Sequence, residues 1–432
     1  MNNQNFSKIF KDGLSQILVD QFESFSAKEF GIERSKLNEI KPLINTPPVV
    51  VITGLRRVGK STLLRQLAHK YLENNYYFVN FEDERLIDFQ TKDFDKLHEN
   101  LITVFGEKKI FLLDEVQNIP NWERFVRRLH DQGYKFFITG SNASLLSEEF
   151  GTRLTGRSER VELFPFSFKE YLKFRGEKIN KTEILTTRKR GKYRNLLNIY
   201  LESGGIPDSL KYPELEIHKN LYNDVLYRDI AARYKIENTR SLKELTFYLE
   251  TNFASLLSYN KLKDLLKLGS VNTVKNYIDH LENSWLFFVI NKYAYSIKEQ
   301  QIAAKKIYSI DTGLSKSIGF SFSDNKGRFL ENLVFLHLRR SYDEIYYYKT
   351  QNEHEIDFYI PKIGLFIQVA TNLDLKETKD REERALIEAK LENNNAKGFI
   401  IITESEEEEY IKDGVSIKVI PMYKWLINDT LI

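Results

Sequence analysis

Residues 49–67, VVVITGLRRVGKSTLLRQL, decide the fold class, because a short β-branched apolar run leads directly into a phosphate-binding motif. Gly54, Gly59, Lys60 and Ser61 stand at the G-x-x-x-x-G-K-S/T spacing of a P-loop. The glycines allow a tight loop whose backbone N–H groups can approach a phosphate, and the lysine adds a positive charge. The apolar run before the motif and the leucines after it predict the strand, loop and helix of a P-loop NTPase.

The loop predicts the cofactors ATP and Mg²⁺. A helix that begins near Lys60 would present its free N–H groups and its positive dipole end to the phosphates. The hydroxyl of Ser61, or of Thr62 beside it, is a suitable ligand for Mg²⁺. The residues expected to bind the nucleotide are Gly54, Leu55, Arg56, Arg57, Val58, Gly59, Lys60, Ser61 and Thr62.

A second apolar run, residues 110–113, is followed by Asp114 and Glu115. A buried strand would deliver both carboxylates at its carboxyl end, the arrangement called Walker B. Phosphoryl transfer needs a positioned nucleophile and charge neutralisation more than covalent chemistry. We therefore expect Asp114 to join Ser61 as a Mg²⁺ ligand. Glu115 is expected to orient the attacking water, with Lys60 as the second catalytic residue.

Residues 135–146, KFFITGSNASLL, predict a third strand, which ends in polar residues. In a P-loop ATPase, a polar side chain at this place can contact the γ-phosphate or the attacking water. Asn142 is the candidate for this catalytic role, and Ser141 would also suit it. The alternative is that these residues cap a helix that follows the strand.

Arg153, Arg157 and Arg160 follow shortly after this strand. Arg153 and Arg157 are candidate arginine fingers, which would stabilise the charge that develops during phosphoryl transfer. The alternative is surface ion pairing with Glu159 and Glu162. The sequence leaves open whether a finger would act within one chain or between chains, and action between chains would require a homo-oligomer.

The composition is that of a globular protein with several domains. The chain has 432 residues, of which 42% are hydrophobic, and a net charge of only +3. Because the charge is nearly balanced, contact with nucleic acid would need a local basic patch. The sequence has no cysteine, no signal-peptide pattern and no apolar run long enough to span a membrane. We therefore expect a soluble, cytoplasmic protein without a membrane partner.

Further motifs follow the P-loop in a fixed order. They are FLLDEVQNI, ITGSNASLL, LTGR followed by LFPFSFKEYL, and GGIPDSL at residues 204–210. From about residue 49 to the end, the chain resembles the bacterial and archaeal AAA-type ATPases that pair this module with a C-terminal domain of unknown function. The resemblance implies an ATP-binding core with a helical lid, then a winged-helix segment, then a nuclease-like fold whose activity it does not define.

We therefore predict an α/β fold: a P-loop NTPase parallel sheet with a helical lid, a winged-helix segment and a C-terminal α/β restriction-endonuclease-like domain. The expected domains are the P-loop ATPase domain with an N-terminal helical extension (1–172), the lid (173–235), the winged-helix segment (236–304) and the restriction-endonuclease-like domain (305–432). A basic run in the lid, residues 188–194, is interpreted as a solvated helix face rather than a nucleic-acid patch.

Residues 255–292 combine an apolar-periodic helix, a Leu-Gly-Ser turn and a second helix that starts at Ser270. This pattern is typical of a helix-turn-helix, with residues 286–290 as a wing strand. Asp279 and Glu282 on the second helix weigh against DNA contact, and the alternative is a packing module. If the segment met DNA, the exposed first-turn residues would be Asn272, Thr273, Lys275 and Asn276.

The last third resembles a restriction-endonuclease-like core, in which a helix Glu, a strand Asp and an E-x-K motif bind Mg²⁺ and activate water. Glu331 and Asp357 occupy the first two positions, but the E-x-K positions read Gln368 and Ala370. An amide is a weak metal ligand and alanine carries no charge, so we expect no nuclease activity. Glu331 and Asp357 would then be relics or hold a helix–strand contact. The acidic residues 404–409 are interpreted as a solvated loop.

Together these features predict an AAA-type ATPase that binds and hydrolyses MgATP to drive a conformational change. The winged-helix segment and the nuclease-like fold indicate action on nucleic acid, with DNA as the expected partner. The acidic run and the lost lysine support the alternative, a nucleotide-dependent switch that binds a protein partner without DNA.

Overall fold

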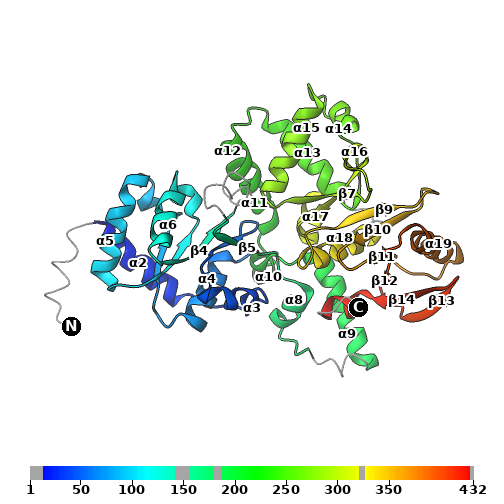
Figure 1. Cartoon of the computed structure of the whole chain (residues 1–432), viewed down its shortest axis with the longest axis horizontal. Helices are drawn as coiled ribbons and strands as arrows, with labels where there is room; N and C mark the ends of the chain where they lie inside the picture. The colour runs from blue at the N-terminus through cyan, green and yellow to red at the C-terminus, as the bar shows by residue number, and fades with distance from the viewer. Residues whose placement is uncertain (1–12, 142–155, 180–185, 321–325, 429–432) are drawn as a thin grey trace. The chain divides into compact units, whose positions relative to one another are not determined.

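The computed structural model describes residues 13–141, 156–179, 186–320 and 326–428. The chain divides into two compact units, Met1–Leu163 and Phe164–Ile432, which we call the N-terminal unit and the C-terminal unit (Figure 1). The predicted P-loop domain extends to residue 172, so its end falls in the C-terminal unit. The finer division into lid, winged-helix and nuclease-like segments stays a prediction. No helix in the described ranges has both the length and the apolar character needed to cross a bilayer.

The N-terminal unit is built on a parallel sheet, five-stranded within the described residues, in the order β2-β3-β4-β1-β5. Its strands are β1 (Val49–Thr53), β2 (Tyr77–Asn80), β3 (Ile110–Asp114), β4 (Lys135–Gly140) and β5 (Ser158–Glu162). Every pairing in this sheet is parallel, so the carboxyl ends of the strands lie at one edge. The strand β5 was not predicted, because its sequence SERVE is charged and half exposed rather than apolar.

Helices pack on this sheet through apolar side chains. Leu18, Leu97 and Phe125 of three helices share one core with Val79 of β2 and Phe111 of β3. The helices are α2 (Gly13–Ala27), α3 (Leu37–Ile40), α4 (Lys60–Tyr71), α5 (Phe94–Phe105) and α6 (Trp122–Asp131), with short 3-10 helices at Lys41–Asn45, Glu84–Leu86, Thr91–Asp93 and Val116–Asn118. The helix α4 begins at Lys60, as the P-loop motif predicts.

The C-terminal unit begins with a helical region in which the GGIPDSL motif has a packing role. The Gly205 N–H donates to Asp311 Oδ2 at 2.6 Å, and a Cβ at Gly204 would lie 1.9 Å from Asp311 Oδ1. Gly204 therefore makes room for a buried carboxylate, and Gly205 donates a hydrogen bond to it. The helices here are α8 (Phe168–Phe174), α9 (Thr187–Ser203), α10 (Pro207–Lys211), α11 (Ile217–Asp224), the π-helical η7 (Val225–Ala231), α12 (Ala232–Tyr234), α13 (Thr239–Thr251) and α17 (Thr312–Ile318).

A mixed sheet, nine-stranded over the described part of this unit, runs in the order β13-β14-β12-β11-β10-β9-β7-β8-β6. Because β7 pairs in parallel with β9, the strands of the predicted winged-helix and nuclease-like segments form one sheet. The strands are β6 (Ser255–Leu257), β7 (Phe287–Lys292), β8 (Lys305–Ser309), β9 (Tyr346–Lys349), β10 (Glu355–Ile360), β11 (Leu365–Val369), β12 (Gly398–Thr403), β13 (Glu408–Lys412) and β14 (Val415–Pro421). The predicted helix-turn-helix segment contains two helices, α14 (Tyr259–Leu265) and α15 (Val271–Asn283), and β7 follows them.

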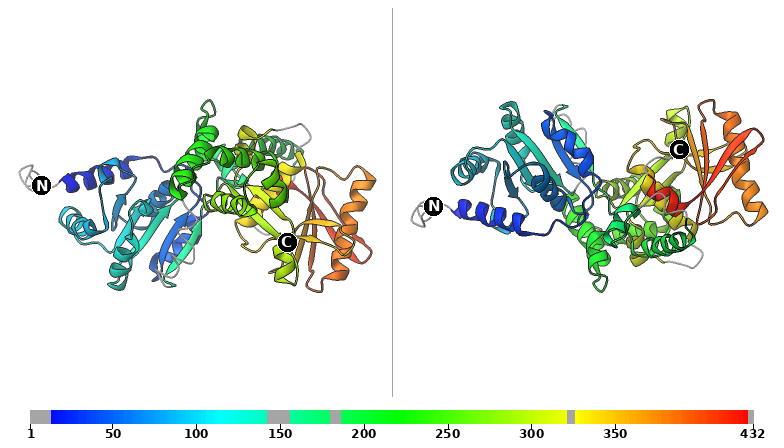
Figure 2. Two further views of the ribbon diagram at one scale, coloured as in Figure 1. Left: turned by 90° about the horizontal axis from the view of Figure 1, so that it is seen from above. Right: turned by 90° about the horizontal axis from the view of Figure 1, so that it is seen from below.

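The remaining helices are α16 (Ile297–Ile302), α18 (Lys326–Arg339), α19 (Lys376–Glu392) and α20 (Met422–Ile427). Figure 2 shows α19 alongside the strands at the β13 end of the sheet in both views, and Leu386 of α19 shares a core with Phe366 and Ile401. From the sequence, residues 404–409 are interpreted as a solvated loop; Glu408 and Glu409 are exposed, but they lie in a strand and not in a loop. These two residues begin β13, because the apolar alternation of β14 offers it an antiparallel partner.

Candidate nucleotide-binding site

The P-loop connects β1 to α4, and both of its glycines are needed for its shape. A Cβ at Gly54 would lie 2.1 Å from the carbonyl oxygen of Leu163, far inside contact distance. Gly59 has a φ of +95°, a left-handed conformation that other residues rarely adopt, immediately before α4. Of the other predicted loop residues, Leu55 and Val58 are buried, Arg56, Ser61 and Thr62 are half-buried, and Arg57 is exposed.

The side chain of Lys60 is buried at the start of α4, and the residue is only 5% exposed. Its Nζ donates to the carbonyl oxygens of Gly54 at 3.2 Å and Leu55 at 3.3 Å. The same Nζ lies 3.4 Å from Glu115 Oε1. The ammonium therefore points into the loop and faces the Walker B carboxylate, where it could contact the phosphates of a nucleotide.

Asp114 is the last residue of β3, and its carboxylate is buried. It accepts hydrogen bonds from the hydroxyls of Ser61 and Thr139. Burial, together with the nearby charge of Glu115, raises the pKa of Asp114. A carboxylate and a hydroxyl are the kinds of oxygen donor that Mg²⁺ prefers, so Asp114 and Ser61 fit a Mg²⁺ ion.

Glu115 follows β3 with a left-handed φ of 51°, which is uncommon for a residue with a side chain and is typical of functional sites. Its N–H donates to Thr139 Oγ1 at 3.0 Å, and its carboxylate accepts from the Gln117 amide. Burial disfavours the ionised carboxylate, but the Lys60 ammonium and the Gln117 amide outweigh burial and lower the pKa of Glu115. Thr139 thus holds both Walker B residues, and the sequence did not single it out for this role.

Arg34, in the N-terminal extension, is a second residue that sequence reasoning missed. It is 3% exposed, and its Nη1 donates to the carbonyl oxygen of Val58 at 2.7 Å. Gln66 of α4 holds the segment in place: its Oε1 accepts from the Arg34 N–H at 3.1 Å, and its Nε2 donates to the Ile32 carbonyl at 2.6 Å. Arg34 therefore fixes the backbone of the P-loop and adds a positive charge beside it.

A cavity of about 460 Å³ adjoins the two candidate Mg²⁺ ligands. Its lining includes both of them, together with Asn80 and Arg65. The Arg56 guanidinium donates to Glu82, another lining residue, at 2.9 Å. The carboxyl edge of the sheet thus has open space beside the oxygen donors, as a hydrated cation would require.

The remaining candidates are the predicted γ-phosphate or water contact and the predicted arginine fingers. Two predicted catalytic residues lie outside the described residues: Asn142 and Arg153. Ser141, the alternative to Asn142, is buried directly after β4. The carbonyl of Arg157 accepts from the N–H of Val49 at 2.7 Å, so Arg157 lies at the amino edge of the sheet, opposite to the P-loop. Its guanidinium pairs with Asp131 at 2.7 Å, away from the nucleotide site of its own chain.

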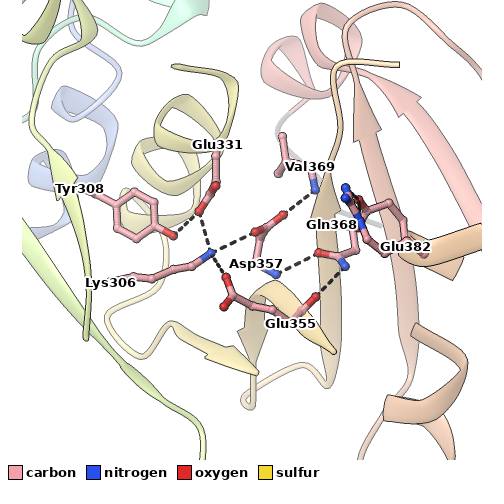
Figure 3. A network of polar contacts seen from close by, with 9 residues as sticks. Lys306, Tyr308, Glu331, Glu355, Asp357, Gln368, Val369 and Glu382 are labelled. Atoms are coloured by element: carbon pink, nitrogen blue, oxygen red, sulfur yellow. Dashed lines mark hydrogen bonds and ion pairs between the residues drawn. The ribbon is translucent and has the colours of Figure 1, made fainter. Parts of the chain in front are cut away.

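The predicted nuclease-like residues form a separate cluster in the C-terminal unit. Glu331 of α18 and Asp357 of β10 both contact the buried Lys306 of β8 (Figure 3). Gln368 of β11 accepts from the Asp357 N–H at 3.0 Å, and Ala370 is buried. The structure therefore shows a contact between a helix and strands at this place, with a lysine at its centre.

A parallel sheet, a P-loop and a pair of carboxylates at the end of β3 define a P-loop NTPase in the N-terminal unit. The family model described as an AAA domain matches residues 46–172, and models of two domains of unknown function, DUF8612 and DUF4143, match residues 194–324 and 326–425. The uncharacterized protein MJ1544 of Methanocaldococcus jannaschii is 35% identical over 414 residues, 90% of each chain. The chain belongs to the family of AAA-type P-loop ATPases that carry C-terminal domains of unknown function.

The chain is also similar to other proteins. An uncharacterized protein of Haemophilus influenzae is 29% identical over 415 residues, which are 91% of this chain and 98% of that protein. Among solved structures, the Walker-type ATPase PABY2304 of Pyrococcus abyssi is similar with a TM-score of 0.39 and 15% identity, over 66% of this chain and 95% of that one. The RuvB Holliday junction branch migration motor of Thermotoga maritima has a TM-score of 0.26 and 16% identity, over 67% and 89%.

Proposed function

We propose that the chain binds MgATP at the P-loop and hydrolyses it to drive a conformational change. The observation that carries the proposal is the convergence of four side chains at the carboxyl edge of one parallel sheet. These side chains are Lys60, Ser61, Asp114 and Glu115. The family membership of the chain supports the same activity.

Each of these groups has a task that its surroundings favour. Lys60 and the loop N–H groups would bind the phosphates, while Ser61 and Asp114 would hold Mg²⁺, which neutralises phosphate charge when bound. Glu115, kept ionised by its neighbours, would orient a water molecule for in-line attack on the γ-phosphate. Because Thr139 fixes the backbone of Glu115, that carboxylate can turn from Lys60 toward a water without moving its main chain.

A Glu115→Gln variant tests the assignment. It should bind ATP like the wild type but turn it over at least about 100-fold more slowly, because the amide cannot orient and polarise water as a carboxylate does. Glu107→Gln, at a surface carboxylate that pairs with Lys109, is the matched control. Turnover at the wild-type rate in the Glu115→Gln variant would contradict the proposal.

We propose further that the hydrolysis serves an action on nucleic acid. Asn272, Lys275 and Asn276 are exposed at the start of α15, the helix that the sequence predicts as the recognition helix. Glu282, one of two acidic residues that weighed against DNA contact, accepts from the Val289 N–H at 2.8 Å. Its carboxylate therefore faces β7 and does not oppose a phosphate backbone.

DNA-dependent turnover tests this part. Duplex DNA should raise the ATPase rate, and the effect should fall steeply as salt rises, because the contacts are with phosphates. Lys275→Ala should weaken the stimulation, while Lys418→Ala on β14 should leave it unchanged. A turnover that DNA does not alter at low salt would exclude this role.

One observation supports the alternative, a switch that binds a protein partner. The segment between β7 and β8 exposes three apolar side chains: Tyr295 (80% exposed), Ile297 (73%) and Ile302 (75%). Neighbouring exposed apolar groups of this kind mark surfaces that bind proteins. Recovery of a partner that requires ATP, together with no effect of DNA on turnover, would favour this alternative.

A further inference from the structure

Lys306 is a buried lysine whose ammonium lies among three carboxylates in the C-terminal unit. The residue is 3% exposed. Its Nζ lies 3.0 Å from Glu331 Oε1, 2.7 Å from Glu355 Oε1 and 3.1 Å from Asp357 Oδ1 (Figure 3). The ammonium donates hydrogen bonds to Glu331 and Asp357, and it forms an ion pair with Glu355.

Neighbouring groups hold these carboxylates in position. Asp357 Oδ2 accepts from the Val369 N–H at 2.9 Å, and the Tyr308 hydroxyl donates to Glu331 Oε1 at 2.8 Å. The side chain of Gln368 bridges the strands, since its Nε2 donates to the Glu355 carbonyl at 2.9 Å. The carboxylates of Asp357 and Glu331 are therefore held by groups other than Lys306, whereas for Glu355 it is the backbone that Gln368 holds.

The charges of the cluster are unequal. Three carboxylates face one ammonium, so the group carries an excess of negative charge when all three are ionised. Burial, with the neighbouring Asp357, raises the pKa of Glu331 to about 7, although Lys306 and Tyr308 act in the opposite direction. A proton on Glu331 offsets this excess, while the raised pKa of Lys306 keeps its ammonium charged.

We propose that Lys306 is a built-in cation that fills a divalent-metal position. Converging, preorganised carboxylate oxygens are the ligands of Mg²⁺, Mn²⁺ and Ca²⁺, which lie about 2.0–2.6 Å from their oxygens. In the native protein the ammonium takes this place, and no set of three or more His, Asp or Glu side chains in the described part of the chain is arranged to hold a metal. Removing the ammonium would leave a site for a divalent cation with oxygen ligands.

The position of Lys306 explains why the chain can lack the E-x-K residues of the nuclease-like pattern. Gln368 bridges backbone groups instead of offering a carboxylate, and Ala370 offers no charge. The lysine comes from β8, and its ammonium occupies the centre of the cluster, where a metal would lie. The C-terminal unit therefore has the carboxylates of a metal site, but its own lysine occupies the position of the metal. The inference does not depend on the proposed ATPase activity.

Two substitutions at one position test the proposal in the full chain without nucleotide. Lys306→Ala opens the centre of the cluster, whereas Lys306→Met removes the charge but keeps the volume. Titration with Mn²⁺, followed by electron paramagnetic resonance, should show at least about tenfold tighter binding to Lys306→Ala than to the wild type or to Lys306→Met. Mn²⁺ should also raise the unfolding temperature of Lys306→Ala alone, and a further Glu355→Gln change should remove both effects.

Equal Mn²⁺ binding by the wild type and Lys306→Ala would overturn the proposal. If Lys306→Ala folds poorly, Mn²⁺ should restore the folded chain, and a chelator added with the Mn²⁺ should prevent this recovery. The absence of any recovery with Mn²⁺ would count against the proposal. A measurement on the wild type is independent of folding: Mn²⁺ held tightly without nucleotide, and lost in Asp357→Asn, would show that the position is not filled by Lys306.

Discussion

Among the described residues, two buried lysines face carboxylates, one in each unit, and they differ in the groups that their N–H donors contact. The Nζ of Lys60 lies 3.2–3.4 Å from two carbonyl oxygens and from Glu115. The Nζ of Lys306 lies 2.7–3.1 Å from three carboxylates. The contacts of an ammonium with neutral carbonyls at the longer distances are weaker than its shorter contacts with carboxylates, so Lys60 can exchange its partners for phosphate oxygens more readily than Lys306 can.

The pKa values of the two glutamates shift in opposite directions, although each glutamate faces a lysine. Glu115 meets one lysine and an amide, and the pKa of Glu115 is lowered in spite of its burial. Glu331 also meets a lysine, but burial and Asp357 raise the pKa of Glu331 to about 7. A buried lysine among carboxylates is therefore part of a binding site only where its charge is not already used within the protein.

The largest expected effect is that of Lys60→Ala. ATP affinity should fall by more than about 100-fold, because several charge-assisted hydrogen bonds to phosphate are lost at once. Lys70→Ala, a surface change on the same helix, is the control and should bind ATP like the wild type. Equilibrium titration with a fluorescent ATP analogue measures both. ATP affinity that is unchanged in Lys60→Ala would show that Lys60, like Lys306, is not part of a binding site.

Asp114→Asn should weaken the binding of Mg²⁺. The apparent affinity for Mg²⁺ during turnover should weaken by about 10–100-fold, because the buried carboxylate that contacts Ser61 loses its charge. Steady-state rates over a range of Mg²⁺ concentrations give this value. Asp95→Asn, at a surface residue that pairs with Arg128, should leave the Mg²⁺ dependence unchanged, and a matching shift in that control would refute the assignment.

Arg34→Ala should have a smaller effect, a loss of about tenfold in ATP affinity, because one charge-assisted bond to the Val58 carbonyl is removed and the loop is less well fixed. Arg34→Lys keeps the charge and should lie between the alanine variant and the wild type. If both variants bind ATP like the wild type, Arg34 serves only the packing of the N-terminal extension.

The smallest effect concerns stability and pH. Burial raises the pKa of Glu250 to about 8 and that of Glu331 to about 7, from the ordinary value of 4.5. The folded state then binds protons more tightly than the unfolded state, so the free energy of unfolding should fall as pH rises from about 5 to 8. Glu250→Gln should flatten this decline. Denaturant unfolding of both proteins at several pH values, followed by a signal from the C-terminal unit, measures this decline, and the same pH dependence in both proteins would be inconsistent with a raised pKa of Glu250.

Local patterns in the sequence predicted much of the N-terminal sheet and of the nucleotide-binding site. The strands β1, β3 and β4 and the start of α4 follow from apolar runs and the P-loop motif, and the approach of Asp114 to Ser61 follows from the common edge of parallel strands. Thr139 could have been found in the same way, since β4 lies between β1 and β3. The four-part division of the chain and the roles of the site residues stay predictions.

Other features could not be read from the sequence because they join distant segments. Arg34 reaches the P-loop from a polar stretch that carries no motif. Lys306 lies on β8, so its contact with Asp357 depends on how the nine strands are ordered. The pairing of β13 with β14 converts part of an acidic run into a strand, although its composition indicates a loop.

The central claim is that one buried lysine serves a site for nucleotide and metal while the other replaces a metal. Counting the Mn²⁺ bound to the full chain, with and without a non-hydrolysable ATP analogue, tests it directly. The account predicts about one tightly held Mn²⁺ per chain with the analogue, lost in Lys60→Ala, and none without the analogue. Mn²⁺ held tightly without the analogue and lost in Asp357→Asn, or no Mn²⁺ in its presence, would contradict it.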